Sequence, residues 1–179
     1  MPDPFISTQD LSDYLGRDVT SDDGAIMAVD AACDIVRDIA EQDFNQTTYT
    51  TSLDGNNLDC LLLAQRPVTA VSSVSVDGTA IDSDDYVFTA GGKLLRNKCD
   101  VWRKGRQNVA VTYTAGYATD DVPRSIRMVA LQIAARYVIQ GVAESEVVGD
   151  VQLSYGMNAA DLTQNELRIL NKYRAARSF

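Results

Sequence analysis

The stretch Asn108–Ile126, "NVAVTYTAGYATDDVPRSI", joins the pattern of a strand to the pattern of a helix. Its first residues alternate large apolar side chains with small or polar ones, as a strand of a half-buried antiparallel sheet requires. Gly116 then permits a sharp corner, and Pro123 suits the first turn of a helix, where its missing N–H costs nothing. The stretch therefore predicts a sheet that passes the chain directly to a helix, with both held as one rigid piece.

Two helices are predicted before this stretch. Ser7 resembles the N-cap of a short helix that ends at Gly16. Residues 21–23, "SDD", begin a longer helix that ends near Asn45. The apolar residues of the longer helix follow one another in steps of three and four, which places them on one face: Ile26, Val29, Cys33, Val36 and Ile39.

Two further helices are predicted at and after the opening stretch. Pro123 opens a central helix, which Gly141 is expected to end. Thr163 and Glu166 form a capping-box pattern that opens a last helix. The apolar face of the central helix consists of Ile126, Val129, Ala130, Ile133, Tyr137 and Val138.

Between these helices, residues 46–116 lack helical periodicity and are rich in Thr, Val, Ser and Tyr, with recurrent turn signals. The order of helices, strands and helices predicts an α+β fold. We expect a helical-bundle core, formed by the N-terminal, central and C-terminal helices, with an inserted antiparallel β-sheet. The candidate strands are residues 47–53, 58–64, 71–78, 85–90, 93–97 and 108–115.

The chain is long enough for one self-sufficient core, because a protein of 179 residues buries roughly 70% of its unfolded surface. We therefore expect a single domain over residues 1–179. Its predicted segments are 1–45, helical; 46–118, the β insertion; 119–141, the central helix; 142–161, a loop or arm; and 162–179, the C-terminal helix.

The charge is acidic overall and unevenly distributed. A net charge of −9, from 16 basic and 25 acidic residues, disfavours a protein that grips a DNA backbone, which requires clustered Lys and Arg. Residues 1–60 contain only two basic side chains, Arg17 and Arg37. The C-terminal cations form either a docking surface for an acidic partner or a solvated helix end whose dipole favours them. These cations are Arg168, Lys172, Arg174 and Arg177.

Most catalytic and metal chemistry lacks the residues that it needs. The sequence has no histidine, which excludes Ser-His-Asp and Cys-His triads, and it has no glycine-rich phosphate loop. Cys33, Cys60 and Cys99 are widely spaced, so we expect no zinc site and a buried free thiol at Cys33. We predict no catalytic residue, no cofactor and no metal.

Two features of the sequence have more than one explanation. The acidic run at residues 82–85 resembles a calcium loop but lacks the required glycine and glutamate, so a turn explains it better. Trp102, the only tryptophan, is either an anchor in the core or a turn, or a contact with a neighbouring subunit. No apolar run is long enough for a membrane span and no signal peptide is recognised, which indicates a cytosolic product that does not enter a membrane.

The order of several motifs resembles one known family over about residues 5–175. The motifs are "AQRPVTAVSSVSVDG", "DYVF", "GGKLL", "VW", "NVAVTYTAGY" and "VPRSIRMVALQIAARY", in this order from Ala64 to Tyr137. In this order they are similar to the head-to-tail connector (adaptor) proteins of long-tailed bacteriophages, in the version with a β insertion. The most specific motif is "VTYTAGY" followed by Val122-Pro123.

The resemblance implies a structural protein of the virion and no catalysis. It implies a homo-oligomeric ring, a dodecamer, docked under the portal protein at the head–tail interface after assembly in the host cytoplasm. The other side of the ring would receive a head-completion (stopper) or tail-completion protein. DNA would pass through the channel without specific binding, because an acidic surface does not hold it.

The C-terminal helix is the predicted portal or subunit interface in this reading. Leu167, Leu170 and Tyr173 would be its apolar anchor, surrounded by Arg168, Lys172, Arg174 and Arg177, and Trp102 would contact a neighbouring subunit. Packing of this helix within its own subunit is the alternative. A different class of function is a small-ligand or carbohydrate-binding α+β module, and a third is a hydrolase that uses carboxylates.

Overall fold

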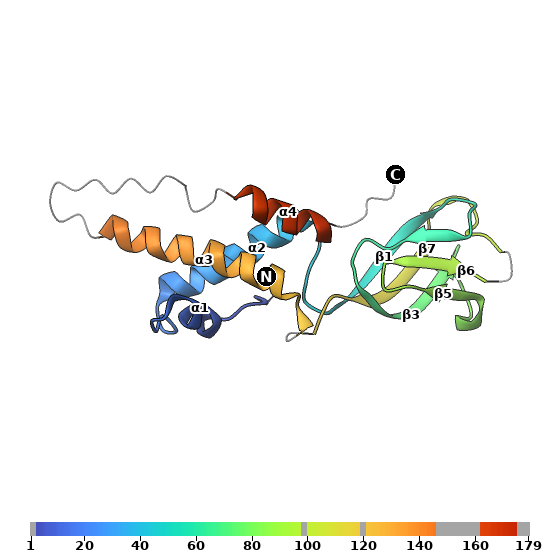
Figure 1. Ribbon diagram of the computed structural model, residues 1–179. Coiled ribbons are helices and arrows are strands. Elements are labelled where there is room, and N and C mark those ends of the chain that lie inside the picture. The colour runs from blue at the N-terminus through green and yellow to red at the C-terminus, as the bar shows by residue number, and fades with distance from the viewer. Residues whose placement is uncertain (1–2, 98–99, 119–120, 146–161, 175–179) are drawn as a thin grey trace. The chain divides into compact units, whose positions relative to one another are not determined.

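The computed structural model describes residues 3–97, 100–118, 121–145 and 162–174. These residues form two compact units, most of whose elements are labelled in Figure 1. Residues 3–41 and 122–174 make up the helical unit, and residues 42–121 make up the sheet unit. The four α-helices and two antiparallel sheets of the described residues confirm the predicted α+β class. The prediction of a single domain stays a prediction.

The helical unit is built around two long helices that pack on each other. The two shorter helices each contact both members of this pair. The four helices are α1 (Thr8–Leu15), α2 (Asp23–Ala40), α3 (Arg124–Ser145) and α4 (Gln164–Tyr173). Here α2 and α3 form the central pair, and α1 and α4 are the shorter helices.

The first helix begins and ends where the sequence predicts. Ser7 Oγ accepts a hydrogen bond from the Asp10 backbone N–H at 3.0 Å, while the Asp10 carboxylate accepts one from the Ser7 backbone N–H at 2.8 Å. This reciprocal pair is a capping box, which satisfies backbone donors that the helix itself leaves unpaired. Gly16 ends the helix at φ 67°, a left-handed conformation that glycine adopts without strain.

The second helix differs from the prediction at its end and on its buried face. It stops at Ala40 rather than near Asn45, with Glu41 in the left-handed conformation. Ile26, predicted in the core, is 42% exposed, whereas Ala25 and Ala28 are buried. Periodicity based on large apolar residues misplaced this face, because the alanines allow close packing of the helices and take the buried positions.

The central helix begins as predicted but continues beyond its predicted end. The Pro123 carbonyl accepts hydrogen bonds from the Ile126 and Arg127 backbone N–H groups, so proline stands at the helix start. Gly141, expected to end the helix, lies inside α3, which runs to Ser145. A glycine within a helix costs only about 1 kcal/mol relative to alanine, so it weakens a helix without stopping it.

The sheet unit contains two antiparallel sheets where one was predicted. The larger sheet has the order β1-β7-β3-β4, and the smaller has the order β2-β6-β5. All six candidate strands are present, and β4 is an addition. The strands are β1 (Thr47–Gly55), β2 (Cys60–Leu62), β3 (Val68–Val76), β4 (Thr79–Ala80), β5 (Tyr86–Phe88), β6 (Lys93–Arg96) and β7 (Gly105–Ala115).

Side chains from both sheets share one hydrophobic cluster. The inward residues of β7 lie opposite those of β1 and β3, because β7 pairs with both strands. Tyr49 and Tyr113 stack at 5.7 Å between ring centroids within this core. The buried members of the cluster are Leu61, Leu63, Val68, Val74, Tyr86, Leu94, Trp102, Val109, Val111, Tyr113 and Ala115.

The corner that follows β7 is fixed by backbone contacts. Gly116 has φ 104°, and a Cβ atom there would lie 2.2 Å from the Asn45 carbonyl oxygen, so only glycine fits. Its N–H donates to the Pro67 carbonyl at 2.9 Å, and the Tyr117 N–H donates to the Phe44 carbonyl at 2.8 Å. The predicted corner is therefore present, while rigid coupling of β7 to α3 stays a prediction.

Candidate functional site

The C-terminal helix, predicted to be an interface, is packed onto its own subunit. Leu170 is fully buried, and Glu166 is nearly so, where α4 contacts α2 and α3. Leu167 is half-buried. The alternative of packing within the subunit therefore accounts for Leu170, which offers no surface to a partner.

A buried ion pair fixes the start of α4 against α3. The Arg136 guanidinium donates to both Glu166 carboxylate oxygens, at 2.7 and 3.3 Å. The Thr163 N–H also donates to Glu166 at 2.7 Å, and Thr163 Oγ1 accepts from the Glu166 N–H. Burial raises the pKa of Glu166, but these hydrogen bonds and the charge of Arg136 outweigh it and hold the pKa below its ordinary value. The carboxylate is therefore ionised at neutral pH.

The opposite face of α4 carries the predicted cations. Arg168 and Lys172 are exposed and have no ion-pair partner among the described residues. Tyr173 is half-buried, with its hydroxyl 3.4 Å from Ser125 Oγ, and the Arg174 guanidinium pairs with Glu41. Arg177 lies outside the described residues. Arg168 and Lys172 are thus the predicted interface residues that the fold leaves available on this face.

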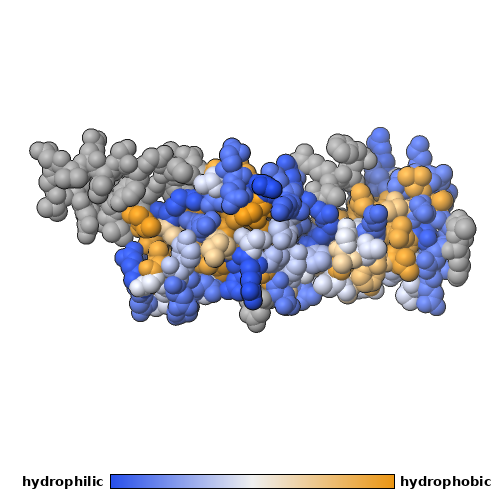
Figure 2. Space-filling view, viewed as in Figure 1, coloured by the Kyte–Doolittle hydropathy of each residue, from blue (hydrophilic) through white to orange (hydrophobic). Residues whose placement is uncertain are grey.

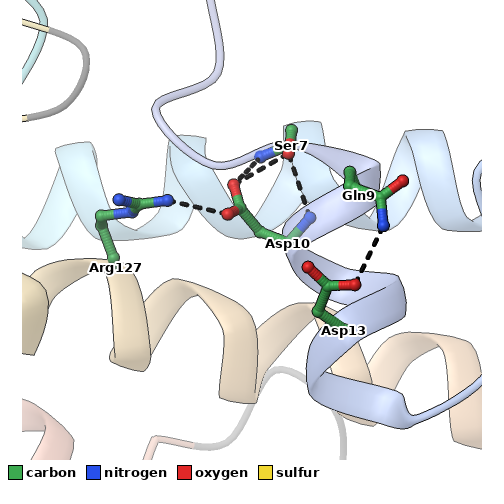
Figure 3. Close-up of polar contacts among 5 residues, drawn as sticks. All are labelled: Ser7, Gln9, Asp10, Asp13 and Arg127. Atoms are coloured by element: carbon green, nitrogen blue, oxygen red, sulfur yellow. Dashed lines mark hydrogen bonds and ion pairs between the residues drawn. The ribbon is translucent and has the colours of Figure 1, made fainter.

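A second polar link ties α1 to α3, as Figure 3 shows. Asp10 accepts from the Ser7 N–H and hydroxyl at one carboxylate oxygen and from Arg127 at the other, 2.8 Å away. Burial raises the pKa of Asp10, but the Ser7 hydrogen bonds and the Arg127 charge outweigh it and lower the pKa overall. One carboxylate thus caps a helix and joins two helices that are far apart in the sequence.

A groove lies on the outward side of α3, between α1 and the start of α4. Its volume is about 390 Å³, and it opens to solvent. Tyr14, at the end of α1, and Ile139, on α3, are 44% and 43% exposed beside it. The groove is lined by Tyr14, Leu15, Gln132, Ala135, Arg136, Ile139, Thr163, Asn165 and Glu166.

This groove was not predicted from the sequence. A signal was present in α3, because two of its large apolar residues, Met128 and Ile139, lie outside the predicted apolar face. Met128 and Ile139 are 46% and 43% exposed, and Figure 2 shows hydrophobic patches on the visible face of the helical unit.

Trp102 belongs to the core of the sheet unit, so the anchor alternative holds and the residue presents no surface. Its side chain is fully buried, and its indole N–H donates to the Asp59 and Leu94 carbonyls at 3.1 and 3.2 Å. The Arg96 guanidinium lies 5.4 Å from the ring centroid. The exposed basic residues Arg103 and Lys104 follow directly on this anchor.

The candidate ligand sites contain no chemistry beyond local structure. Asp82 accepts from the Asp84 N–H at 3.0 Å and caps a short 3-10 turn, as the turn explanation predicts. Cys33 is buried, which raises the pKa of its thiol. Across the described residues, no group of three potential ligands could hold a metal ion. No helix in this part of the chain is long and apolar enough to cross a membrane.

Comparison with known proteins identifies the family. The model of the family described as "Head completion protein" matches residues 4–176. The chain therefore belongs to the head completion protein family. This confirms the predicted class, a structural head–tail connector protein of a phage-like particle, and gives no support to the small-ligand-binding alternative. A search of curated protein sequences finds no match.

Solved structures with low sequence identity share the fold. The neck of an empty gene transfer agent (GTA) particle, computed with C6 symmetry, contains a chain that is 14% identical, with a TM-score of 0.66, covering 99% of this chain and 93% of that one. The neck of the native particle, computed with C12 symmetry, gives 13% identity and 0.64, covering 100% and 94%. The native GTA virion gives 14% and 0.63, covering 100% and 95%.

Proposed function

We propose that this protein forms a ring at the head–tail junction of a phage-like particle, where it extends the DNA channel beneath the portal protein. Family membership over residues 4–176 carries this proposal. The shared fold with chains in GTA necks, whose structures were computed with C6 and C12 symmetry, supports a ring of twelve copies. The ring receives a stopper or tail-completion protein on its other side and works without catalysis or a cofactor.

The helical unit and the acidic charge of the chain both suit such a part. The four packed helices act as the bundle core of each subunit, with α1 and α4 tied to α3 by ion pairs. The net charge of −9 favours an inner surface along which DNA slides without being held. In this proposal the protein assembles in the host cytoplasm, and its final location is the particle.

We assign portal docking to the exposed face of α4. Arg168 and Lys172 lie one helical turn apart and are both exposed. Charged residues at the rim of an interface set its specificity and its rate of association. Deletion of residues 163–179 is a poor test of this role, because it also removes the buried Leu170 and the Glu166 ion pair.

The ring is tested by negative-stain imaging and native mass spectrometry at high concentration, with and without the portal protein. We expect closed rings, alone or on the portal, since an interface too weak to offset association entropy still forms on a template. A monomer that ignores the portal at every concentration contradicts the proposal.

The docking face is tested by reversing its charge with Arg168→Glu and Lys172→Glu together. We expect portal binding to weaken about tenfold or more, because attraction to an acidic patch becomes repulsion. The control is Arg103→Glu with Lys104→Glu, which makes the same charge change on the exposed surface of the sheet unit and also removes the exposed Arg103–Asp77 ion pair at 3.5 Å. Equal losses in both double variants would show that net charge, and not this face, controls docking.

A further inference from the structure

A ring of identical subunits needs two different surfaces on each copy that fit each other. Such a head-to-tail contact repeats around the ring until it closes. The ring itself rests on the proposed function. The question is therefore which two surfaces of this chain are complementary, and the helical unit carries a pair.

The first surface is a ridge on the outer face of α2. Met27 is 71% exposed and Ile26 is 42% exposed, although both lie in a helix whose other face is the core. Exposed acidic residues, Asp23 and Asp30, lie one turn away on either side of Met27. The ridge is therefore an apolar surface flanked by carboxylates, and none of the described residues covers it.

The second surface is the groove on α3. Its floor and walls include the aliphatic side chain of Ile139, the small Ala135 and the ring of Tyr14. Met128 continues the exposed apolar face of α3 toward the start of the helix, where Arg124 is also exposed. A cavity of about 390 Å³ has room for one or two side chains of the size of methionine.

These two surfaces face away from each other. The helices α2 and α3 pack through their buried faces. The exposed face of each helix is therefore on the far side of the pair. A head-to-tail contact requires this arrangement, because each copy must present one surface to each of its two neighbours.

Both apolar patches also lie at the same end of the helix pair. Tyr14 and Leu15, which end α1, line the groove beside Ile139, and a short connection then leads to the start of α2. At the other end, Tyr173 reaches Ser125 and Arg174 pairs with Glu41. The end of α2 is therefore near the start of α3, and the two helices run in opposite directions (Figure 1).

The charged residues of α2 and α3 are also placed so that opposite charges meet in such a contact. Toward its end, α2 carries Asp34 and Asp38, with Arg37 as its only basic residue. Asp34 pairs with Arg37, whereas Asp38 is exposed. At that same end of the pair, α3 exposes Arg124. When the ridge of one copy meets the groove of the next, the acidic second half of α2 therefore faces Arg124 of the neighbouring copy.

We propose that the partner of this groove is a second copy of the chain, and that Met27 and Ile26 of one subunit's α2 insert into the α3 groove of its neighbour. The contact buries apolar side chains that a monomer exposes, which favours association. It also gives a reason for the exposed apolar side chain of Ile139 on α3, which the contact covers in the ring.

Directed disulfide formation tests the contact. Cys60 and Cys99 are first replaced by serine, while the buried Cys33 stays. Met27→Cys and Ile139→Cys are then combined in one chain, and rings formed with or without the portal are oxidised. We expect a ladder of covalent oligomers that ends at the ring size. The matched control combines Met27→Cys with Val87→Cys, an equally exposed position in the sheet unit, and should give no ladder.

A charge variant gives an independent readout. Met27→Glu should abolish ring formation without lowering the thermal midpoint, because the side chain is 71% exposed. Rings that form but give no ladder with Ile139→Cys would overturn this contact and leave the proposed function intact. Absence of rings of the wild-type protein under every condition, including with the portal, would overturn the proposed function and this contact with it.

Discussion

The sheet unit and the helical unit are each stabilised by different interactions. The sheet core consists of large branched and aromatic side chains from both sheets. The helical unit has alanine-rich buried faces and is tied at its edges by ion pairs, Arg127–Asp10 at 2.8 Å and Arg136–Glu166 at 2.7 Å. The largest single packing loss is therefore expected in the sheet unit, at Trp102, whereas protonation of carboxylates should affect the helical unit first.

The largest expected effect is in the sheet unit, for Trp102→Ala. Replacing a buried aromatic side chain with alanine costs about 3–5 kcal/mol in unfolding free energy. The change also leaves the Asp59 and Leu94 carbonyls without their indole donor. Denaturant unfolding followed by circular dichroism measures the loss.

The matched control for that variant is Trp102→Phe. It keeps most of the apolar volume and removes the indole N–H, so its cost should be smaller. If both variants unfold at the midpoint of the wild type, Trp102 is not the anchor that its burial indicates.

A matched pair of leucines tests whether the two units unfold separately. Leu170→Ala in the helical unit and Leu94→Ala in the sheet unit each remove a fully buried side chain, at about 2–5 kcal/mol. Trp102 is the only tryptophan, so its fluorescence reports on the sheet unit. We expect Leu94→Ala to shift the fluorescence transition and Leu170→Ala to shift mainly the helical signal at 222 nm. Identical shifts of both signals would show that the units unfold as one.

The smallest effect concerns pH. The pKa of Glu166 is lowered in the folded protein, so its stabilising contribution is complete above the ordinary value of 4.5 and is lost as the pH falls through the lower folded value. The pKa of Asp10 is lowered in the same direction. On acidification we therefore expect the helical signal to decline before the fluorescence of Trp102 changes.

Glu166→Gln is the control for this pH effect. It keeps the shape of the side chain and cannot ionise, so stability at neutral pH should fall and its dependence on acid should become weaker. An acid profile identical to that of the wild type would show that Glu166 does not link stability to pH.

Local signals in the sequence predicted most elements of both units. The caps at Ser7 and Thr163, the strands and the corner at Gly116 all depend on residues close together in the chain. The burial of Val29, Cys33 and Val36 also follows from steps along one helix. These features were predictable because each is decided within a few residues.

What the sequence could not provide depends on contacts between distant residues. The division of the strands into two sheets requires pairings such as Thr47 with Ala115 and Leu61 with Leu94. The link from Asp10 to Arg127 is of the same kind. Trp102 was ambiguous for this reason, because an anchor and a contact residue have the same local sequence.

The connectivity of the two units has a consequence for synthesis on the ribosome. Within the described part of the chain, the sheet unit is one continuous segment, residues 42–121, whereas the helical unit is assembled from pieces on either side of it. At 5–20 residues per second, about 80 residues correspond to roughly 4–16 s between the completion of α2 and the first residues of α3. During that interval only α1 is available to cover the alanine-rich face of α2, because α3 and α4 have not yet been made. The sheet unit can therefore fold first, and the nascent chain exposes part of an amphipathic helix that a chaperone can bind.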